Sequence, residues 1–179
     1  MKKIYLIILL TISSLTFGQN NCDELKAENE NLKRQISEMK KILLITTSIK
    51  EVQVGDINVK LMNITGDIRT QTVQIEMLFT NTGINADGFT TKIKSIISAG
   101  GSEVVLENAQ IGSKSGSSYL PSSELYRNTP LKCIYTFKGV VPETFIIKAF
   151  PVPFQYSKQG TRTTTKEEIL FNDLTINWK

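Results

Sequence analysis

The order of hydrophobic positions divides the chain into three parts. An apolar N-terminal run comes first, a stretch with a seven-residue repeat follows, and in the long C-terminal part apolar and polar residues alternate. A period of two is typical of strands with one buried and one solvated face, and a 3.5-residue repeat is typical of helices that pair in coiled coils. The pattern predicts a β domain preceded by one long helix.

Seven short runs carry the β pattern, separated by clusters of Gly, Asn, Pro and Ser. They lie at residues 57–62, 73–79, 93–97, 104–111, 131–138, 145–149 and 169–178. Seven such strands within residues 56–179 are typical of two antiparallel sheets that bury each other's apolar faces. The predicted fold class is mainly β, a seven-stranded antiparallel Ig-like β-sandwich preceded by one long N-terminal coiled-coil helix.

The seven-residue repeat predicts that residues 20–47 form this helix, followed by a linker at residues 48–55. With Asn29 at position a, the a and d positions hold Cys22, Leu25, Asn29, Leu32, Ile36, Met39 and Leu43. An Asn at an a position fixes the register and favours two parallel strands. We predict a parallel homodimer through residues 20–47, in which the two Cys22 thiols meet and can form a disulfide.

Two other arrangements would also cover the apolar stripe of the helix. The stripe can pack on its own β domain. The helix can also pair antiparallel, because acidic residues crowd its first half and basic residues its second half. The repeat alone leaves both alternatives open.

The apolar N-terminal run predicts export. Residues 1–18 have two basic residues, an apolar core to Leu15 and small residues before Gln19, as secretory signal peptides do. An uncleaved anchor would need a span of about 20 apolar residues, and a lipoprotein would need a better lipobox before Cys22. We therefore expect a periplasmic or extracellular protein whose mature part has no membrane span.

Composition excludes several kinds of partner and chemistry. Cleavage of the predicted signal peptide removes Lys2 and Lys3 and lowers the net charge from +4 to +2. This charge is too small to indicate a nucleic acid as partner. The chain has no His, the usual general base and metal ligand. No nucleophile with a base, no paired carboxylates and no phosphate loop is found. We expect no enzyme, no cofactor and no metal, with an enzyme of unrecognised type as an alternative.

Two further residues have structural interpretations. Cys133 alternates with polar residues in its run and is interpreted as a buried free thiol, since Cys22 lies in a different part of the chain. Trp178 is expected to pack the last strand on the core. The pair Asn172-Asp173 is expected to shift the alternation of that strand as a bulge.

Two stretches of the β part resemble a known class of protein. They are TQTVQIEMLFTNTG and, after a Gly/Ser-rich middle, PLKCIYTFKGV with TFIIKAFPVPF. Together they are similar to small exported bacterial proteins of unknown function with an N-terminal coiled coil and an Ig-like β-sandwich, over roughly residues 56–179. The resemblance implies a fold and an extracytoplasmic setting, and no activity.

Three loops are long enough to carry a binding site. Residues 81–89 have a faint likeness to an oxygen-rich calcium loop, and residues 112–130 and 155–166 combine aromatic with basic side chains, a common composition at interfaces. The predicted ligand contacts are Tyr119, Tyr126, Arg127, Tyr156 and Arg162.

These expectations combine into one hypothesis of function. The chain is expected to be an exported, non-enzymatic structural or binding protein that self-associates through its coiled coil and presents β-sandwich domains, with a cell-envelope protein or glycan as the partner. In the alternative, it is an envelope assembly subunit whose helix docks on a different protein.

Overall fold

The computed structural model describes residues 25–36, 38, 48–117 and 120–179. The chain divides into two compact units, residues 1–46 and 47–179, and each is described by itself. The predicted signal peptide, Cys22, Met39, Leu43 and Tyr119 lie outside the described residues.

The described part of the first unit is helical, at residues 25–36 and 38. Leu25, Leu32 and Ile36 recur at heptad spacing and therefore share one side of the helix. Their side chains are 62%, 50% and 50% exposed. The predicted helix is confirmed over these residues, and its pairing stays a prediction.

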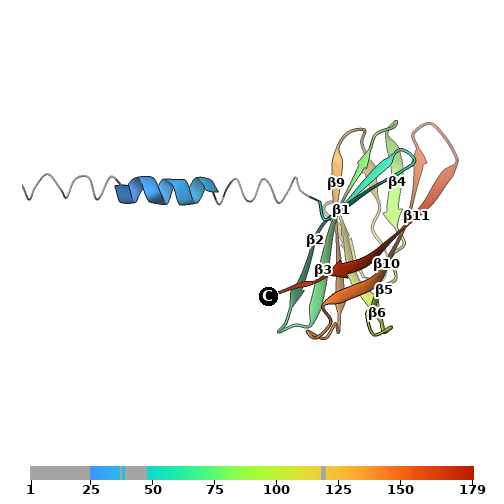
Figure 1. Cartoon of the computed structure of the whole chain (residues 1–179). Coiled ribbons are helices and arrows are strands. Elements are labelled where there is room, and N and C mark those ends of the chain that lie inside the picture. The colour runs from blue at the N-terminus through green and yellow to red at the C-terminus, as the bar shows by residue number, and fades with distance from the viewer. Residues whose placement is uncertain (1–24, 37, 39–47, 118–119) are drawn as a thin grey trace, which may run out of the picture. The chain divides into compact units, whose positions relative to one another are not determined.

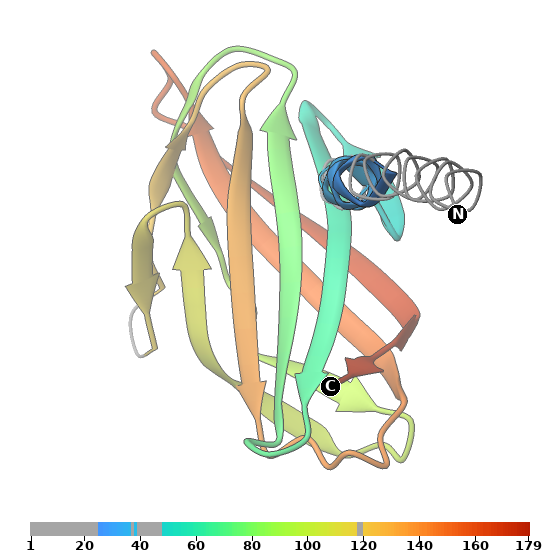
Figure 2. The ribbon, with the colours of Figure 1, turned by 90° about the vertical axis from the view of Figure 1, so that its left-hand side faces the viewer.

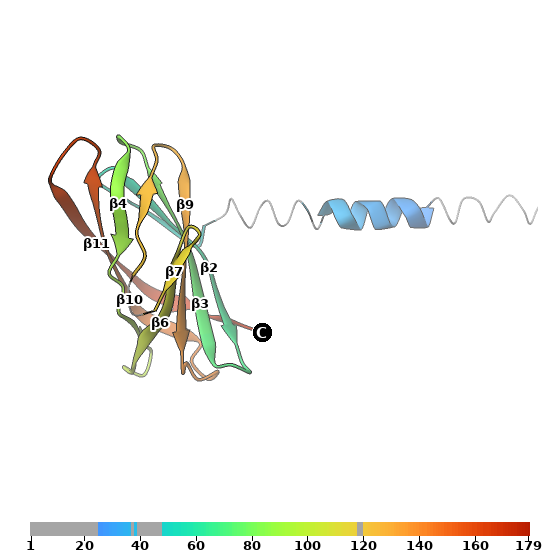
Figure 3. The same cartoon turned by 180° about the vertical axis from the view of Figure 1, so that it is seen from behind.

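The second unit is an antiparallel β-sandwich (Figures 1 and 3). One sheet contains β1 (Lys50–Val54), β2 (Ile57–Asp67), β3 (Thr72–Asn81), β9 (Pro130–Lys138), β6 (Glu103–Ile111) and β7 (Lys114–Gly116) in that order. β12 (Asn177–Trp178) pairs parallel with β2 at the edge of this sheet. Figure 2 shows β2, β3 and β9 side by side, with β10 and β11 crossing behind them.

The second sheet is built around β10 (Ile146–Lys158). β11 (Thr164–Thr175) pairs with one edge of β10, and β4 (Ala86–Thr91) and β5 (Ser95–Ser98) share the other edge. β8 (Ser123–Leu125) pairs with β4 at the outside. β6 joins the two sheets, because its first residues pair with β5 and its last residues pair with β9.

Two prolines in β10 explain why its neighbour is broken into β4 and β5. The carbonyl oxygen of Pro153 accepts a hydrogen bond from the Lys92 amide, so this proline faces the β4–β5 edge. Pro151 lies two residues away and faces the same edge. Neither proline can donate to a ladder. The gap at residues 92–94 lies opposite them in register.

The inward faces of both sheets form one core. It is rich in aromatic rings, with Phe79, Phe89 and Phe154 in one group and Tyr135, Phe137, Phe150 and Phe171 in another. The prediction of a mainly β, antiparallel sandwich is confirmed. Cys133 is also confirmed as a buried free thiol within this core.

The predicted strand count and linker were wrong. The first six predicted runs fall in β2, β3, β5, β6, β9 and β10, and the last run covers the end of β11 and all of β12, while the described residues contain twelve strands. β1 occupies most of the predicted linker at residues 48–55 and pairs with β2, with Val52 opposite Val59. Strands β1, β7 and β8 lie at sheet edges or are only three residues long. They bury few side chains, so their sequences lack a clear alternation.

The predicted change of alternation near the end of β11 is confirmed at Asp173, which has a φ of 54°. β10 has a matching irregularity, because its pairing with β5 shifts between Ile147 and Ala149. Each strand thus has one extra residue, Lys148 in β10 and Asp173 in β11, and these two residues form an ion pair in which Nζ lies 2.7 Å from Oδ1. The register between β10 and β11 therefore continues unchanged across them.

Trp178 packs against the core, as predicted, and Gly66 makes room for it. The indole donates from Nε1 to the carbonyl oxygen of Thr144 at 2.9 Å. A Cβ atom at Gly66 would lie 2.2 Å from Cε3 of Trp178. A side chain at this position and the indole cannot occupy the same space.

We expect Gly66→Ala to lower the free energy of unfolding by about 2–3 kcal/mol, because the methyl group overpacks the indole site. Denaturant unfolding followed by the fluorescence of Trp178, the single tryptophan, measures this. Gly100→Ala is the control, since its Cβ would lie 3.9 Å from the nearest atom, Ser98 Oγ, and should change stability by less than about 0.5 kcal/mol. Equal stability of both variants would contradict the packing.

Burial raises the pKa of the Cys133 thiol from 9.0 to about 12. The folded state then holds its proton more tightly than the unfolded state, so its stability is intact below pH 9 and falls as the pH rises from 9 to about 12. We expect Cys133→Val to remove about 1 kcal/mol of the loss between pH 8 and pH 10. Urea unfolding at both pH values measures it. An identical loss in the variant would argue against a buried thiol.

Candidate functional site

Four connections meet at one end of the sandwich, at the top of Figure 1. They join β1 to β2 at residues 55–56, β3 to β4 at 82–85, β8 to β9 at 126–129, and β10 to β11 at 159–163. We call this surface the loop end. The three loops that the sequence singled out separately all contribute to it.

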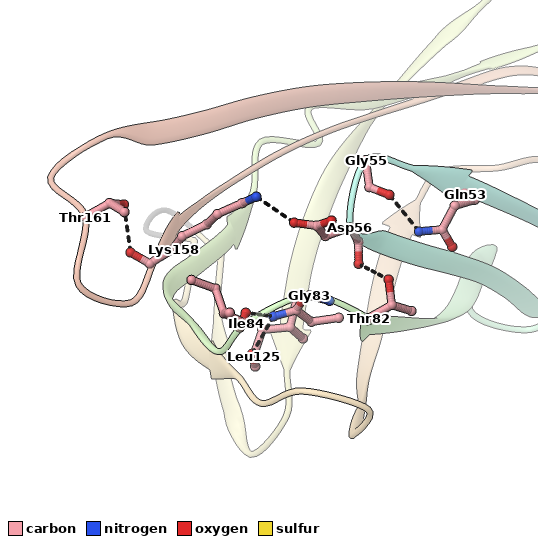
Figure 4. Close-up of polar contacts among 10 residues, drawn as sticks. Gln53, Gly55, Asp56, Thr82, Gly83, Ile84, Leu125, Lys158 and Thr161 are labelled. Atoms are coloured by element: carbon pink, nitrogen blue, oxygen red, sulfur yellow. Dashed lines mark hydrogen bonds and ion pairs between the residues drawn. The ribbon is translucent and has the colours of Figure 1, made fainter.

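Asn81, the last residue of β3, holds two of these connections together. Its side chain is 1% exposed. The Nδ2 group donates to the carbonyl oxygens of Ile84 and Leu125, and Oδ1 accepts from the Gly83 amide at 2.9 Å (Figure 4). One buried amide thus satisfies backbone groups of both the β3–β4 loop and β8.

Asn85 extends the network to the other loops. Its Oδ1 accepts from the Arg127 amide at 2.8 Å, and its carbonyl oxygen accepts from the Gln159 amide at 2.8 Å. The Asn128 amide donates to the carbonyl oxygen of Asn81 at 2.7 Å. The positions of these loops are therefore fixed by hydrogen bonds to one another.

The β1–β2 turn joins through Asp56, as Figure 4 shows. The carbonyl oxygen of Asp56 accepts from the Thr82 amide at 2.8 Å, and its carboxylate pairs with Lys158 Nζ at 2.6 Å. The hydrogen bond to Asp56 raises the pKa of Lys158. A Cβ atom at Gly83 would lie 2.7 Å from Cγ of Asp56, so the glycine allows this close approach.

A layer of aromatic rings lies below the loop end. Phe79 and Phe89 are 4.9 Å apart between ring centroids, and Tyr156 stacks on Phe154 at 6.5 Å. Tyr156 is only 3% exposed. The prediction that its ring contacts a ligand was therefore wrong, because alternation along β10 turns this residue into the core.

Three other predicted contacts are exposed at the loop end: Tyr126, Arg127 and Arg162. The Tyr126 hydroxyl donates to the Glu124 carboxylate, and this bond raises the pKa of Tyr126. The backbone of Arg127 is held by the hydrogen bond from its amide to Asn85. Its guanidinium makes no ion pair with a described residue. Tyr126 is 54% exposed and Ile84, from the neighbouring loop, is 53% exposed.

The likeness of residues 81–89 to a calcium loop is not supported by the geometry. The side-chain oxygens of Asn81 and Asn85 already accept backbone hydrogen bonds, which leaves the Asp87 carboxylate. Among the described residues, no three His, Cys, Asp or Glu side chains form a group that could hold a metal ion. The arrangement can offer an aromatic ring, an aliphatic side chain and arginines to a partner.

The described part of the chain contains no helix long and apolar enough to cross a membrane.

Comparisons with known proteins show a similarity of fold between this chain and solved structures. No family model and no curated protein matches the chain. Among solved structures, it is similar to the GAE domain of GGA2p from Saccharomyces cerevisiae, with a TM-score of 0.49 and 13% identity over 70% of this chain and 96% of that chain. It is also similar to the yeast GGA1 GAE domain, with a TM-score of 0.46 and 12% identity over 69% and 95%.

Sequence reasoning noticed Asn81, Asn85 and Lys158 as loop residues but missed their role in building the loop end, and it did not identify Asp56 at all. Asn81 and Asn85 stand in a turn-rich stretch, where Asn commonly bonds to nearby backbone. That signal indicates a local turn. It does not indicate that the amides also reach β8 and the β8–β9 connection, which are about 40 residues away along the chain.

We expect Asn81→Ala to lower the free energy of unfolding by about 2–4 kcal/mol, since three hydrogen bonds in a buried place are lost. Amide hydrogen exchange should rise in residues 83–87 and 125–128 before it rises in β3. Asn58→Ala is the control, because Asn58 makes an exposed bond to Glu51. Uniform exchange in both variants would show that Asn81 does not hold the loops.

Proposed function

We propose that this protein is an exported, non-enzymatic structural or binding protein. It pairs with a second copy through a parallel coiled coil at residues 20–47 and presents Ig-like sandwich domains to a cell-envelope protein or glycan. The observation that carries the proposal is the apolar stripe of Leu25, Leu32 and Ile36, which is half or more exposed on the described helix. A stripe with this spacing is stabilised when a second helix covers it.

Charge next to the stripe favours the parallel arrangement. In the heptad that places Asn29 at a, the e positions are Lys26, Lys33 and Lys40. An antiparallel homodimer brings e positions of the two chains together, so lysines would face lysines. A parallel homodimer brings Glu28 at g beside Lys33 at e of the second copy, and adds favourable ion pairs.

The loop end is the proposed contact surface, through Tyr126, Arg127 and Arg162. The hydrogen bonds of Asn81 and Asn85 fix its shape before any partner arrives, which lowers the entropy lost on binding. Two linked copies bind a repetitive surface more tightly than one copy when both can engage.

We expect mature Gln19–Lys179 to be a dimer by light scattering, with and without reductant. Without reductant, a covalent form that depends on Cys22 is also expected. Leu25→Asp with Leu32→Asp should give a monomer, because carboxylates would face each other in the apolar seam.

The control places two Asp residues at the outer f positions, Ala27→Asp with Arg34→Asp. It should stay dimeric, because these positions face solvent in the heptad. The fluorescence of Trp178, which packs on the core of the β domain, should be unchanged in both variants. A wild-type monomer at all concentrations would contradict the proposal.

The alternative is an envelope assembly subunit whose helix docks on a heterologous helix. The same exposed stripe favours it, since any amphipathic helix can cover the stripe. A monomeric wild type that forms a stoichiometric complex through residues 20–47 would support this alternative instead.

A further inference from the structure

A polar depression of about 310 Å³ lies beside the β2–β3 turn, away from the loop end. It is lined by Thr65, Gly66, Asp67, Arg69, Thr72, Gln74 and Lys179. The C-terminal segment forms one wall, because the Lys179 amide donates to the carbonyl oxygen of Gly66 at 2.9 Å and its own carbonyl accepts from Ile68. The volume is at the lower end of the range for small-ligand sites.

The floor of the depression is made by side chains on neighbouring strands. Thr65 lies opposite Gln74, and Asp67 lies opposite Thr72, in the register of β2 and β3. All four point to the outer face of the sheet, because their neighbours Val73 and Ile75 point into the core. Hydroxyl, amide and carboxylate groups thus stand on one surface with no apolar side chain among them.

Two residues with cationic side chains, Arg69 and Lys179, also line the depression. Neither the Arg69 guanidinium nor the Lys179 ammonium forms an ion pair with a described side chain. The Asp67 carboxylate is already fixed, since its Oδ1 accepts from the amides of Arg69 and Thr70 at 2.8 and 3.2 Å. These bonds lower the pKa of Asp67, so the group is ionised at neutral pH and its second oxygen can accept a hydrogen bond.

We propose that this depression binds an acidic saccharide. Arg69 and Lys179 pair with a carboxylate or sulfate group of the sugar, because a guanidinium offers two parallel donors to such an oxyanion. Thr65, Thr72 and Gln74 exchange hydrogen bonds with ring hydroxyls, and Asp67 accepts from one hydroxyl.

The mixed chemistry separates a saccharide from simpler anions. A lone phosphate or sulfate would be repelled by Asp67 and would leave the floor of hydroxyl and amide groups unused. An acidic peptide would bring apolar atoms to a depression whose lining residues include no apolar side chain. A neutral sugar would leave the two cations unpaired.

This site is independent of the loop end and of the proposed pairing of helices. The depression lies within one β domain, so a monomeric protein would bind equally well at this site. Loss of dimerisation would therefore leave the inference untouched.

The test is a titration of ¹⁵N-labelled Gln19–Lys179 followed by amide chemical shifts. The probes are trigalacturonate for a carboxylate source and a heparin-derived tetrasaccharide for a sulfate source. Cellotriose, inorganic sulfate and a hexaglutamate peptide are the comparisons. We expect at least one acidic saccharide to shift the amides of residues 65–74 and Lys179, with affinity about tenfold or more above that of every comparison probe.

Arg69→Gln should weaken that binding about tenfold or more, since one charge-assisted pair is lost. Arg34→Gln is the matched control, because it removes an exposed arginine from the helix, outside the β domain, and should leave the affinity unchanged. Both variants should keep the melting temperature of the wild type, as both arginines are exposed.

Several results would overturn the inference. One is the absence of shifts with both acidic saccharides. Another is equal affinity for cellotriose, inorganic sulfate or hexaglutamate, which would mean a hydroxyl site, a simple anion site or a peptide site respectively. Unchanged affinity in Arg69→Gln would also reject it.

Discussion

The rest of the structure depends on the mutual burial of two inward sheet faces. Each sheet has an apolar face that water would penalise, and the two faces cover each other through rings such as Tyr135, Phe137 and Phe150. β6 belongs to both sheets, so the layers are also joined by continuous backbone. Irregularities are tolerated where they keep this burial. The extra residues Lys148 and Asp173 are a clear example, because they occur as a pair on neighbouring strands and leave the register unchanged.

The two ends of the sandwich follow from this core in different ways. At the loop end, the connections rest on Phe79, Phe89 and Phe154 and are tied to one another by Asn81 and Asn85. Buried amides are costly unless every polar group is paired, so these ties favour a single arrangement of the loops. Beside the β2–β3 turn, by contrast, the fixed groups are backbone amides and Asp67, while the Arg69 side chain is exposed and forms no ion pair with a described side chain.

The sequence predicts the long, two-sided strands well and the rest poorly. β3 and β9 alternate over nine or more residues, and β2 alternates from Ile57 to Leu61 before its irregularity, so their period is visible without a structure. β1 buries little, and β4 contains Asp87-Gly88, which is typical of a turn, so neither was predicted. The loop end could be predicted only in part: Tyr126 and Arg127 were identified from composition, but the ring of Tyr156 is buried. Residues 155–158 were predicted to be part of a loop but belong to β10, and composition alone does not show which side chains of a strand face the core.

The hydrogen bonds between the loops also affect how the loop end would select a partner. Loops that move adapt to many partners and lose entropy each time they bind. Here the Arg127 amide and the Gln159 amide are both held by Asn85, so two connections cannot move independently. A partner at the proposed contact surface would then have to fit the existing positions of Tyr126 and Ile84, which are exposed on neighbouring loops. Selectivity at this surface would come from the side chains that the fixed backbone presents, and substitutions there would change the choice of partner without changing the fold.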